Sequence, residues 1–235
     1  MTDLIYLQDS YQRECDATVL YADGTSVVLD QTVLYAQGGG QPFDTGAIAR
    51  GGDTFKVVAV KKKDGQVVHE LDRPGLAVGD AAHVTVDWER RYRLMRMHTA
   101  SHVLCAVGHK ELGIKITGNQ LDLQKSRMDF DLEDCDKAIM QGIVDKANAL
   151  IVQGASISIS FMSREEALKI PSMVKLAGAL PPEIPIWRLV GIEGIDLQAD
   201  GGTHVKDIKE IGKIMLLSVD NKVKDNRRIY FTLEP

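Results

Sequence analysis

The first 86 residues have the pattern of short β-strands. β-Branched segments are separated by clusters of glycine, aspartate and proline at short intervals, which is typical of a small antiparallel barrel or sandwich. An Asp23-Gly24 pair between two such segments predicts a β-hairpin. No helix is expected in this part of the chain. The predicted strands are 18–21, 26–29, 32–35, 55–61, 66–71 and 83–86.

The hydrophobic period changes at Asp87. This residue has the chemistry of a helix N-cap, and from Trp88 apolar residues recur every three or four positions until Gly108. The spacing predicts a helix of about five turns. We therefore expect an N-terminal β-barrel at 1–86 and a second domain at 87–235.

The rest of the chain mixes helices and strands without a regular alternation. A second long helix is predicted at 133–153, and Ser163 with Glu166 has the spacing of a capping box for a short helix ending before Pro171. These features predict an α+β domain with long helices packed on an antiparallel sheet, so the fold class of the whole chain is mixed. Its predicted strands are 120–123, 127–132, 156–162, 186–192, 213–219 and 228–233.

Composition narrows the class of protein. The 235 residues are 44% apolar and 26% charged, as in folded globular chains. The net charge of −5 excludes a generally basic surface, so an RNA partner would have to meet a local patch. Three groups of basic residues are candidates for phosphate contacts, although each is more often a solvated face: Arg90, Arg91, Arg93 and Arg96; Lys61–63; and Lys222, Lys224, Arg227 and Arg228.

The expected location is the cytoplasm. The apolar segments are far shorter than the roughly 20 residues that span a bilayer, so we expect no membrane segment, and the N-terminus lacks the pattern of a secretory signal. The three cysteines, Cys15, Cys105 and Cys135, are widely spaced without a C-x-x-C pair. They are expected to be free thiols of a reducing compartment, and Cys105 is expected to pack in the core.

Histidines are placed as metal ligands would be. His98 and His102 are four residues apart in the predicted helix, so their imidazoles share one face. Two solvated helix histidines would have the same spacing. The segment from Asp200 to His204 favours the metal, because its two glycines allow a sharp turn that brings carboxylate and imidazole together. Three imidazoles and a carboxylate predict a Zn²⁺ site, in which Asp200 either ligates the ion or stays outside its first shell.

Two other motifs argue against a metallopeptidase and against an ATP-binding protein. Thr99 follows the first helix histidine where a metallopeptidase has its glutamate base. The glycine-rich segment Gln37–Pro42 is expected to be a flexible turn, and it lacks the Gly-Lys-Ser/Thr ending of a nucleotide phosphate loop. Neither peptidase activity nor ATP use is therefore indicated.

Taken together, the motifs resemble those of the AlaX proteins, free-standing relatives of the editing domain of alanyl-tRNA synthetase. The similarity covers nearly the whole chain, and its length is that of the medium-length class. The matching motifs are TVLYAQGGGQPFDTG (32–46), RMHTASHVL (96–104), SRMDFD (126–131), DGGTHV (200–205), EIG (210–212) and NRRIYF (226–231).

The resemblance implies a hydrolase that acts in trans, removing serine or glycine wrongly attached to tRNA(Ala) and so protecting the fidelity of translation. It implies that His98, His102 and His204 bind one zinc ion, with Asp200 where the family has a cysteine. It also implies that Thr99 reads the serine hydroxyl, and that the loop formed by Gly38, Gly39 and Gly40 helps to exclude alanine.

Three points stay open at this stage. Gln120 is a further candidate to hydrogen-bond the substrate, although the polarity of its predicted strand explains it equally well. A zinc-stabilised tRNA-binding module without turnover is an alternative, as is editing of a different aminoacyl-tRNA. The sequence does not define the oligomeric state.

Overall fold

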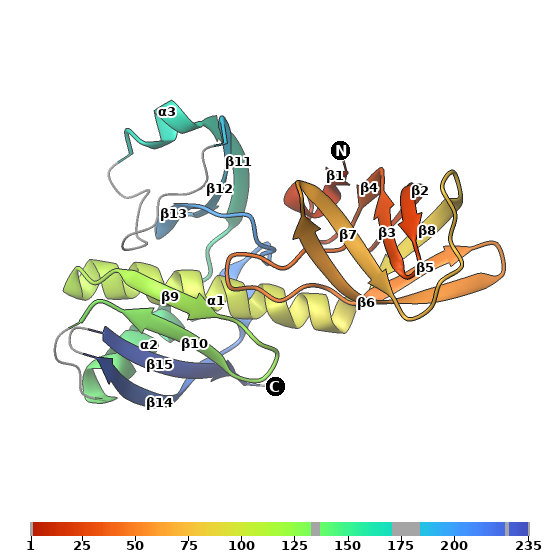
Figure 1. The fold of residues 1–235 in the computed structure, drawn as a ribbon. Coiled ribbons are helices and arrows are strands. Elements are labelled where there is room, and N and C mark those ends of the chain that lie inside the picture. Colours follow the sequence, from red (N-terminus) through yellow and green to blue (C-terminus); the bar gives the residue numbers. More distant parts are fainter. Residues whose placement is uncertain (1, 133–136, 171–183, 224–225, 235) are drawn as a thin grey trace. The chain divides into compact units, whose positions relative to one another are not determined.

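The structure is a computed structural model that describes residues 2–132, 137–170, 184–223 and 226–234. The chain divides into two units, Met1–Leu94 and Met95–Pro235. The first contains a closed barrel, and the second contains helices with antiparallel sheets (Figure 1). The predicted mixed fold, a β-barrel followed by an α+β part, is confirmed.

Six antiparallel strands close the barrel of the first unit in the order β2-β3-β7-β6-β5-β8. Alternate residues such as Val19, Val27 and Val84 are buried in its core, which accounts for the period-two pattern. The strands are β2 (Glu14–Asp23), β3 (Ser26–Leu29), β5 (Gly46–Arg50), β6 (Asp53–Lys63), β7 (Gln66–Leu71) and β8 (Ala81–Val86). Outside the barrel, β1 (Asp3–Leu4) pairs in parallel with β4 (Gln31–Thr32), and η1 (Ile5–Leu7) is a 3₁₀ turn in a region where we expected no helix.

The predicted strand at 32–35 is wrong beyond Thr32. The next residues are buried as a loop whose backbone bonds to side chains instead of to a neighbouring strand. Tyr35 N donates to the Asp44 carboxylate at 2.7 Å, and the Val33 carbonyl accepts from Arg91. The apolar residues of this segment therefore predicted burial correctly, but not a strand. Side chains far along the chain supply hydrogen-bond partners for its backbone.

The glycine-rich segment forms a tight hairpin turn. Gly38 and Gln41 exchange two backbone hydrogen bonds, of 3.2 and 2.8 Å, across Gly39 and Gly40, whose φ angles are 57° and 81°. Two successive positive φ values are those of a type I′ turn, which glycine adopts without strain. The Tyr35 hydroxyl also donates to the Gly38 carbonyl at 2.8 Å. The predicted turn is thus held by hydrogen bonds.

The first long helix, α1 (Trp88–Leu112), begins as predicted. The Asp87 carboxylate accepts a hydrogen bond from Arg90 N at 3.3 Å, which is an N-cap contact. The predicted end at Gly108 is wrong, because α1 continues to Leu112 and is followed by Gly113, where φ is 69°. At Gly108 an added Cβ would lie 3.0 Å from the Ile114 side chain, so this glycine serves close packing and does not end the helix.

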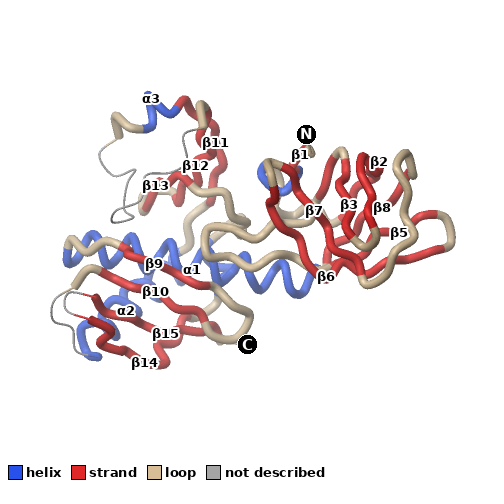
Figure 2. Tube along the Cα trace, viewed as in Figure 1, coloured by secondary structure: helices blue, strands red, loops and turns tan. Residues whose placement is uncertain are grey.

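A four-stranded antiparallel sheet in the order β14-β15-β10-β9 forms one part of the second unit. Helix α2 (Lys137–Gln153) packs on β14, where the Asn148 side chain exchanges hydrogen bonds of 2.9 and 2.8 Å with the Ile214 backbone. The predicted first turn of α2, at 133–136, lies outside the described residues. The strands are β9 (Ile116–Gln120), β10 (Ser126–Phe130), β14 (Ile214–Val223) and β15 (Asn226–Leu233), arranged as Figure 2 shows.

The strand predicted at 120–123 is a turn. β9 ends at Gln120, and Asp122 N donates to the Ser126 hydroxyl at 3.1 Å. Because Leu121 is buried in this turn, its apolar neighbourhood resembled a strand. β9 and β10 pair as antiparallel strands on either side of this turn.

A three-stranded antiparallel sheet, β11-β12-β13, completes the second unit with two short helices. Ser163 caps α3 (Arg164–Ala167) by accepting from Glu166 N at 3.2 Å, as the capping box predicted. The strands are β11 (Ile157–Ser163), β12 (Ile186–Ile192) and β13 (Asp196–Ala199), and the 3₁₀ helix is η2 (Ile208–Ile211). β13 and η2 were not predicted. None of the described helices is both long and apolar enough to cross a membrane.

Candidate metal centre

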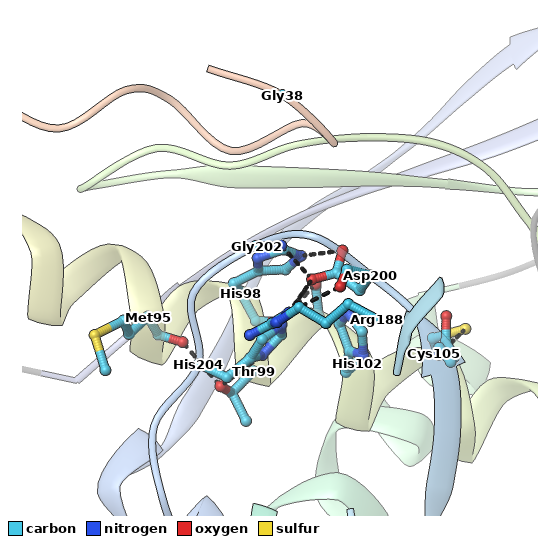
Figure 3. Close-up of polar contacts among 12 residues, drawn as sticks. Gly38, Met95, His98, Thr99, His102, Cys105, Arg188, Asp200, Gly202 and His204 are labelled. Atoms are coloured by element: carbon cyan, nitrogen blue, oxygen red, sulfur yellow. Dashed lines mark hydrogen bonds and ion pairs between the residues drawn. The ribbon is translucent and has the colours of Figure 1, made fainter. Parts of the chain in front are cut away.

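Four side chains of the second unit converge on one point. The imidazoles of His98 and His102 project from α1, and the loop after β13 brings Asp200 and His204 against them (Figure 3). One nitrogen or oxygen from each of the four lies within 4.8 Å of the corresponding atoms of the others. The imidazole centroid of His204 is 4.4 Å from that of His98 and 4.7 Å from that of His102. The four residues that the sequence predicts as metal ligands therefore lie close together in the fold.

Local hydrogen bonds hold the loop in this conformation. Asp200 N donates to the Arg188 carbonyl on β12 at 3.1 Å, and the Arg188 guanidinium donates to the Asp200 carbonyl at 2.8 Å. Within the loop, Gly202 N donates to the Asp200 carboxylate at 2.6 Å. The carboxylate is thereby aimed at the histidines before any ligand binds.

Burial keeps the imidazoles of His98 and His204 neutral. It lowers the pKa of His98 well below the ordinary value and that of His204 to about 4, and in both cases Asp200 only partly opposes the effect. Burial alone would raise the pKa of the Asp200 carboxyl, but the neighbouring histidines outweigh burial and hold that pKa well below its usual range. At neutral pH the cluster thus offers imidazole lone pairs and one carboxylate, the protonation states that metal binding needs.

The spacing between neighbouring donors is compatible with one shared metal ion. Ligand atoms about 2.0 to 2.2 Å from a tetrahedral ion lie about 3.3 to 3.6 Å from one another. Here Asp200 Oδ2 is 3.0 Å from His204 Nε2, and Asp200 Oδ1 is 3.6 Å from His98 Nε2. Three imidazoles and one carboxylate in this arrangement could hold a single divalent metal ion.

Curated proteins similar to this chain cover its full length. The alanyl-tRNA editing protein AlaX-M of Saccharolobus solfataricus is 45% identical over 238 residues, which is 100% of each chain. The AlaX-M protein of Methanosarcina barkeri is 45% identical over 241 residues, or 99% of each chain. The chain belongs to the AlaX-M family. An alanine–tRNA ligase from Thermoplasma acidophilum is 34% identical over 98% of this chain, which corresponds to 27% of the ligase.

Two family models match separate parts of this AlaX-M chain. The model of class II (A) tRNA synthetases matches residues 4–90, and that of the second additional domain of threonyl- and alanyl-tRNA synthetases matches residues 187–230. The second match includes Asp200 and His204. The predicted resemblance to AlaX proteins and to the alanyl-tRNA synthetase editing domain is confirmed.

Thr99 lies behind the histidines of the AlaX-M chain. Its side chain is fully buried, and the hydroxyl contacts the Met95 carbonyl at 2.9 Å, His204 Nδ1 at 3.2 Å and Val205 N at 3.3 Å. A hydroxyl has one proton and two lone pairs. Three partners therefore use its full hydrogen-bonding capacity.

The other predicted substrate contacts lie on different elements. Gln120 is exposed at the end of β9, paired with Arg127, and no hydrogen bond joins it to the four clustered residues in the part of the chain that is described. Gly38, Gly39 and Gly40 belong to the first unit. A role for these residues in substrate binding stays a prediction.

Two residues near the cluster were not found from the sequence. Arg188, buried in β12, holds the Asp200 loop, and Asp196, fully buried in β13, lies 4.0 Å from His102 Nδ1. The unusual signal at Arg188 was a charged residue inside an apolar segment. Asp196 gave no such signal, because its position depends on the pairing of β13 with β12.

Most of the described basic candidates bind other parts of the protein. Arg91 is fully buried against Asp44, Arg228 pairs with Asp129 at 2.6 Å, and Arg96 donates to the Ile211 carbonyl at 2.8 Å. Lys61–63, in contrast, are exposed on the barrel. Cys105 is buried as expected, and both described cysteines, Cys15 and Cys105, are free thiols, whereas Cys135 lies outside the described residues.

Proposed function

We propose that this chain is an aminoacyl-tRNA deacylase that removes serine, and also glycine, from wrongly charged tRNA(Ala). The observation that carries the proposal is the cluster of three buried imidazoles and one carboxylate, in a chain 45% identical to AlaX-M editing proteins over its full length. Because the substrate takes part in translation, the cytoplasm is the proposed location.

His98, His102, His204 and Asp200 are the proposed ligands of one zinc ion. Bound there, zinc would polarise the ester carbonyl and lower the pKa of a water molecule. The scissile bond is an ester to the terminal ribose, which is more reactive than an amide, so water suffices as the nucleophile. The products are the free amino acid and the free tRNA, and neither ATP nor a covalent enzyme intermediate is needed.

Selectivity for serine requires recognition of one hydroxyl group. A pocket that hydrogen-bonds this hydroxyl penalises alanine, because alanine leaves the polar groups of the pocket unpaired. Gln120 is the proposed side chain for such a bond, and the loop Gly38, Gly39 and Gly40 is proposed to help exclude alanine. The proposal for the loop rests on its sequence motif, and that for Gln120 rests on the polar side chain at the end of β9.

The direct test follows loss of labelled amino acid from tRNA(Ala) charged with serine, glycine or alanine. We expect deacylation of seryl- and glycyl-tRNA(Ala), little of alanyl-tRNA(Ala), and loss of activity on chelation with recovery on added zinc. Binding of tRNA(Ala) without turnover would support a zinc-stabilised binding module instead. Turnover of only another mischarged tRNA would keep the enzyme class and replace the substrate.

A further inference from the structure

We propose that Thr99 is a positioning residue that fixes the tautomer of His204, so that Nε2 is free to bind the metal ion. This inference rests on the metal site of the proposed function and goes beyond it. Thr99 would act through His204 from the side opposite the ion. Asp196 would act in the same way on His102.

The hydrogen bonds of Thr99 define the direction of each proton. The Met95 carbonyl can only accept, and Val205 N can only donate. When the single hydroxyl proton goes to Met95 at 2.9 Å, the Thr99 oxygen is left as an acceptor for Val205 N–H and for His204 Nδ1–H at 3.2 Å. A neutral imidazole with its proton on Nδ1 has its lone pair on Nε2.

That lone pair points at the rest of the cluster. Nε2 of His204 lies 3.0 Å from Asp200 Oδ2. In this tautomer both atoms are acceptors, and a cation between them converts a repulsive contact into two metal–ligand bonds. Thr99 therefore favours the tautomer that zinc requires, at the expense of the one in which Nε2 donates its proton to Asp200.

The second imidazole also has an acceptor on its Nδ1 side, although at a longer distance. His102 Nδ1 is buried without a hydrogen bond within the described structure, and the nearest acidic oxygen is Asp196 Oδ2 at 4.0 Å. The Asp196 side chain is itself fully buried and accepts a hydrogen bond from Gln198. A carboxylate on the Nδ1 side favours a proton there, which leaves Nε2 as the metal-binding nitrogen.

Positioning of His204 by Thr99 is a different role from recognition of the substrate's serine hydroxyl. The Thr99 hydroxyl has three partners within the protein, and its side chain has no exposed surface. Loss of a hydrogen-bond partner behind a metal-binding histidine typically weakens metal binding about 10- to 100-fold. The two roles therefore predict different defects.

The experiment uses Thr99→Val, which keeps the shape and loses the hydroxyl, with Thr99→Ser as the matched control. Zinc affinity is measured by competition with a chromophoric chelator, and the tautomer of His204 by long-range ¹H–¹⁵N NMR of the zinc-loaded wild type. We expect about tenfold or greater weakening in Thr99→Val, near wild-type affinity in Thr99→Ser, and a proton on Nδ1 of His204. The NMR measurement needs no variant, so it remains decisive if Thr99→Val fails to fold.

Either of two results would overturn the inference: His204 protonated on Nε2 in the zinc-loaded protein, or unchanged zinc affinity in folded Thr99→Val. Unchanged affinity combined with loss of serine selectivity would assign Thr99 to substrate reading instead. Deacylation is measured on the same preparations. An inactive wild type with the expected zinc affinity and tautomer would refute the proposed activity and leave this inference standing.

Discussion

Asp200 Oδ2 lies 3.0 Å from His204 Nε2, although the pair belongs to a loop and not to a helix. The turn at Gly201 and Gly202 closes this contact, and Arg188 supports it from β12. The four-residue spacing of His98 and His102 arises differently, from one turn of α1. Two unrelated local geometries thus supply the halves of the metal centre.

The first prediction concerns the histidines. Replacing His204 by alanine removes one imidazole of the cluster, so we expect loss of both zinc and deacylase activity; His98→Ala should behave in the same way. His83→Ala is the control, since His83 lies on the barrel with its side chain 44% exposed and pairs with Asp16. Metal analysis of the purified variants checks the outcome. A His204→Ala protein that kept its zinc and activity would exclude His204 as a ligand.

Variants of Asp200 test whether its carboxylate binds the metal directly or only supports the site. Asp200→Ala is expected to weaken zinc binding by a factor of ten or more, because it removes the one anionic donor of the cluster. Asp200→Cys introduces the cysteine that the resemblance to AlaX proteins implies at this position, and a thiolate is expected to retain the metal. Chelator competition with both variants tests this. Tight zinc binding without activity in Asp200→Ala would place the carboxylate outside the ligand set.

Asp44 is predicted to be a principal stabilising residue of the first unit. Its carboxylate pairs with Arg91 where both side chains are fully buried. Removing it by Asp44→Ala leaves a buried guanidinium without its counter-charge, and we expect a loss of about 3 to 5 kcal/mol in the free energy of unfolding. Asp53→Ala is the control, because its 3.4 Å pair with Arg50 is exposed and should contribute less than about 1 kcal/mol. Urea unfolding at neutral pH measures both, and equal effects would contradict the argument.

His69 should make the first unit sensitive to mild acid. Burial lowers its pKa from the ordinary value of 6.5 to about 4, and its Nε2 contacts the Thr32 hydroxyl at 2.9 Å. Between these two pH values the unfolded chain takes up a proton that folded His69 does not, so stability falls as the pH falls. At pH 5 the expected loss from this group is about 2 kcal/mol.

His69→Gln cannot take up this proton and is the variant for comparison. The loss of unfolding free energy between pH 7 and pH 5 should be smaller in the variant by about the same 2 kcal/mol. Urea unfolding of both proteins at the two pH values gives this difference, in which the other histidines cancel. An identical loss in both proteins would show that His69 does not titrate as proposed.

Patterns within the chain predicted the class of the fold, the four donors of the cluster and the family. A period of two defined the barrel strands, a period of three to four defined α1, and the local motifs around His98 and Asp200 named all four members of the cluster. These features are readable because they depend on residues close together in the chain. Where partners are distant, the same reasoning failed: the apolar segment after Thr32 is a loop because Asp44 and Arg91 bind its backbone.

The polar groups on the Nδ1 side of His204 and His102 could be found only in the folded chain. The approach of His204 to Thr99, and of Asp196 to His102, depends on the packing of α1 against segments about a hundred residues away. No periodicity records such contacts, because a hydroxyl or carboxylate has the same local pattern whether it faces water or an imidazole. The donors could therefore be predicted from the sequence. The direction in which each imidazole presents its lone pair could not, because it depends on contacts between distant segments.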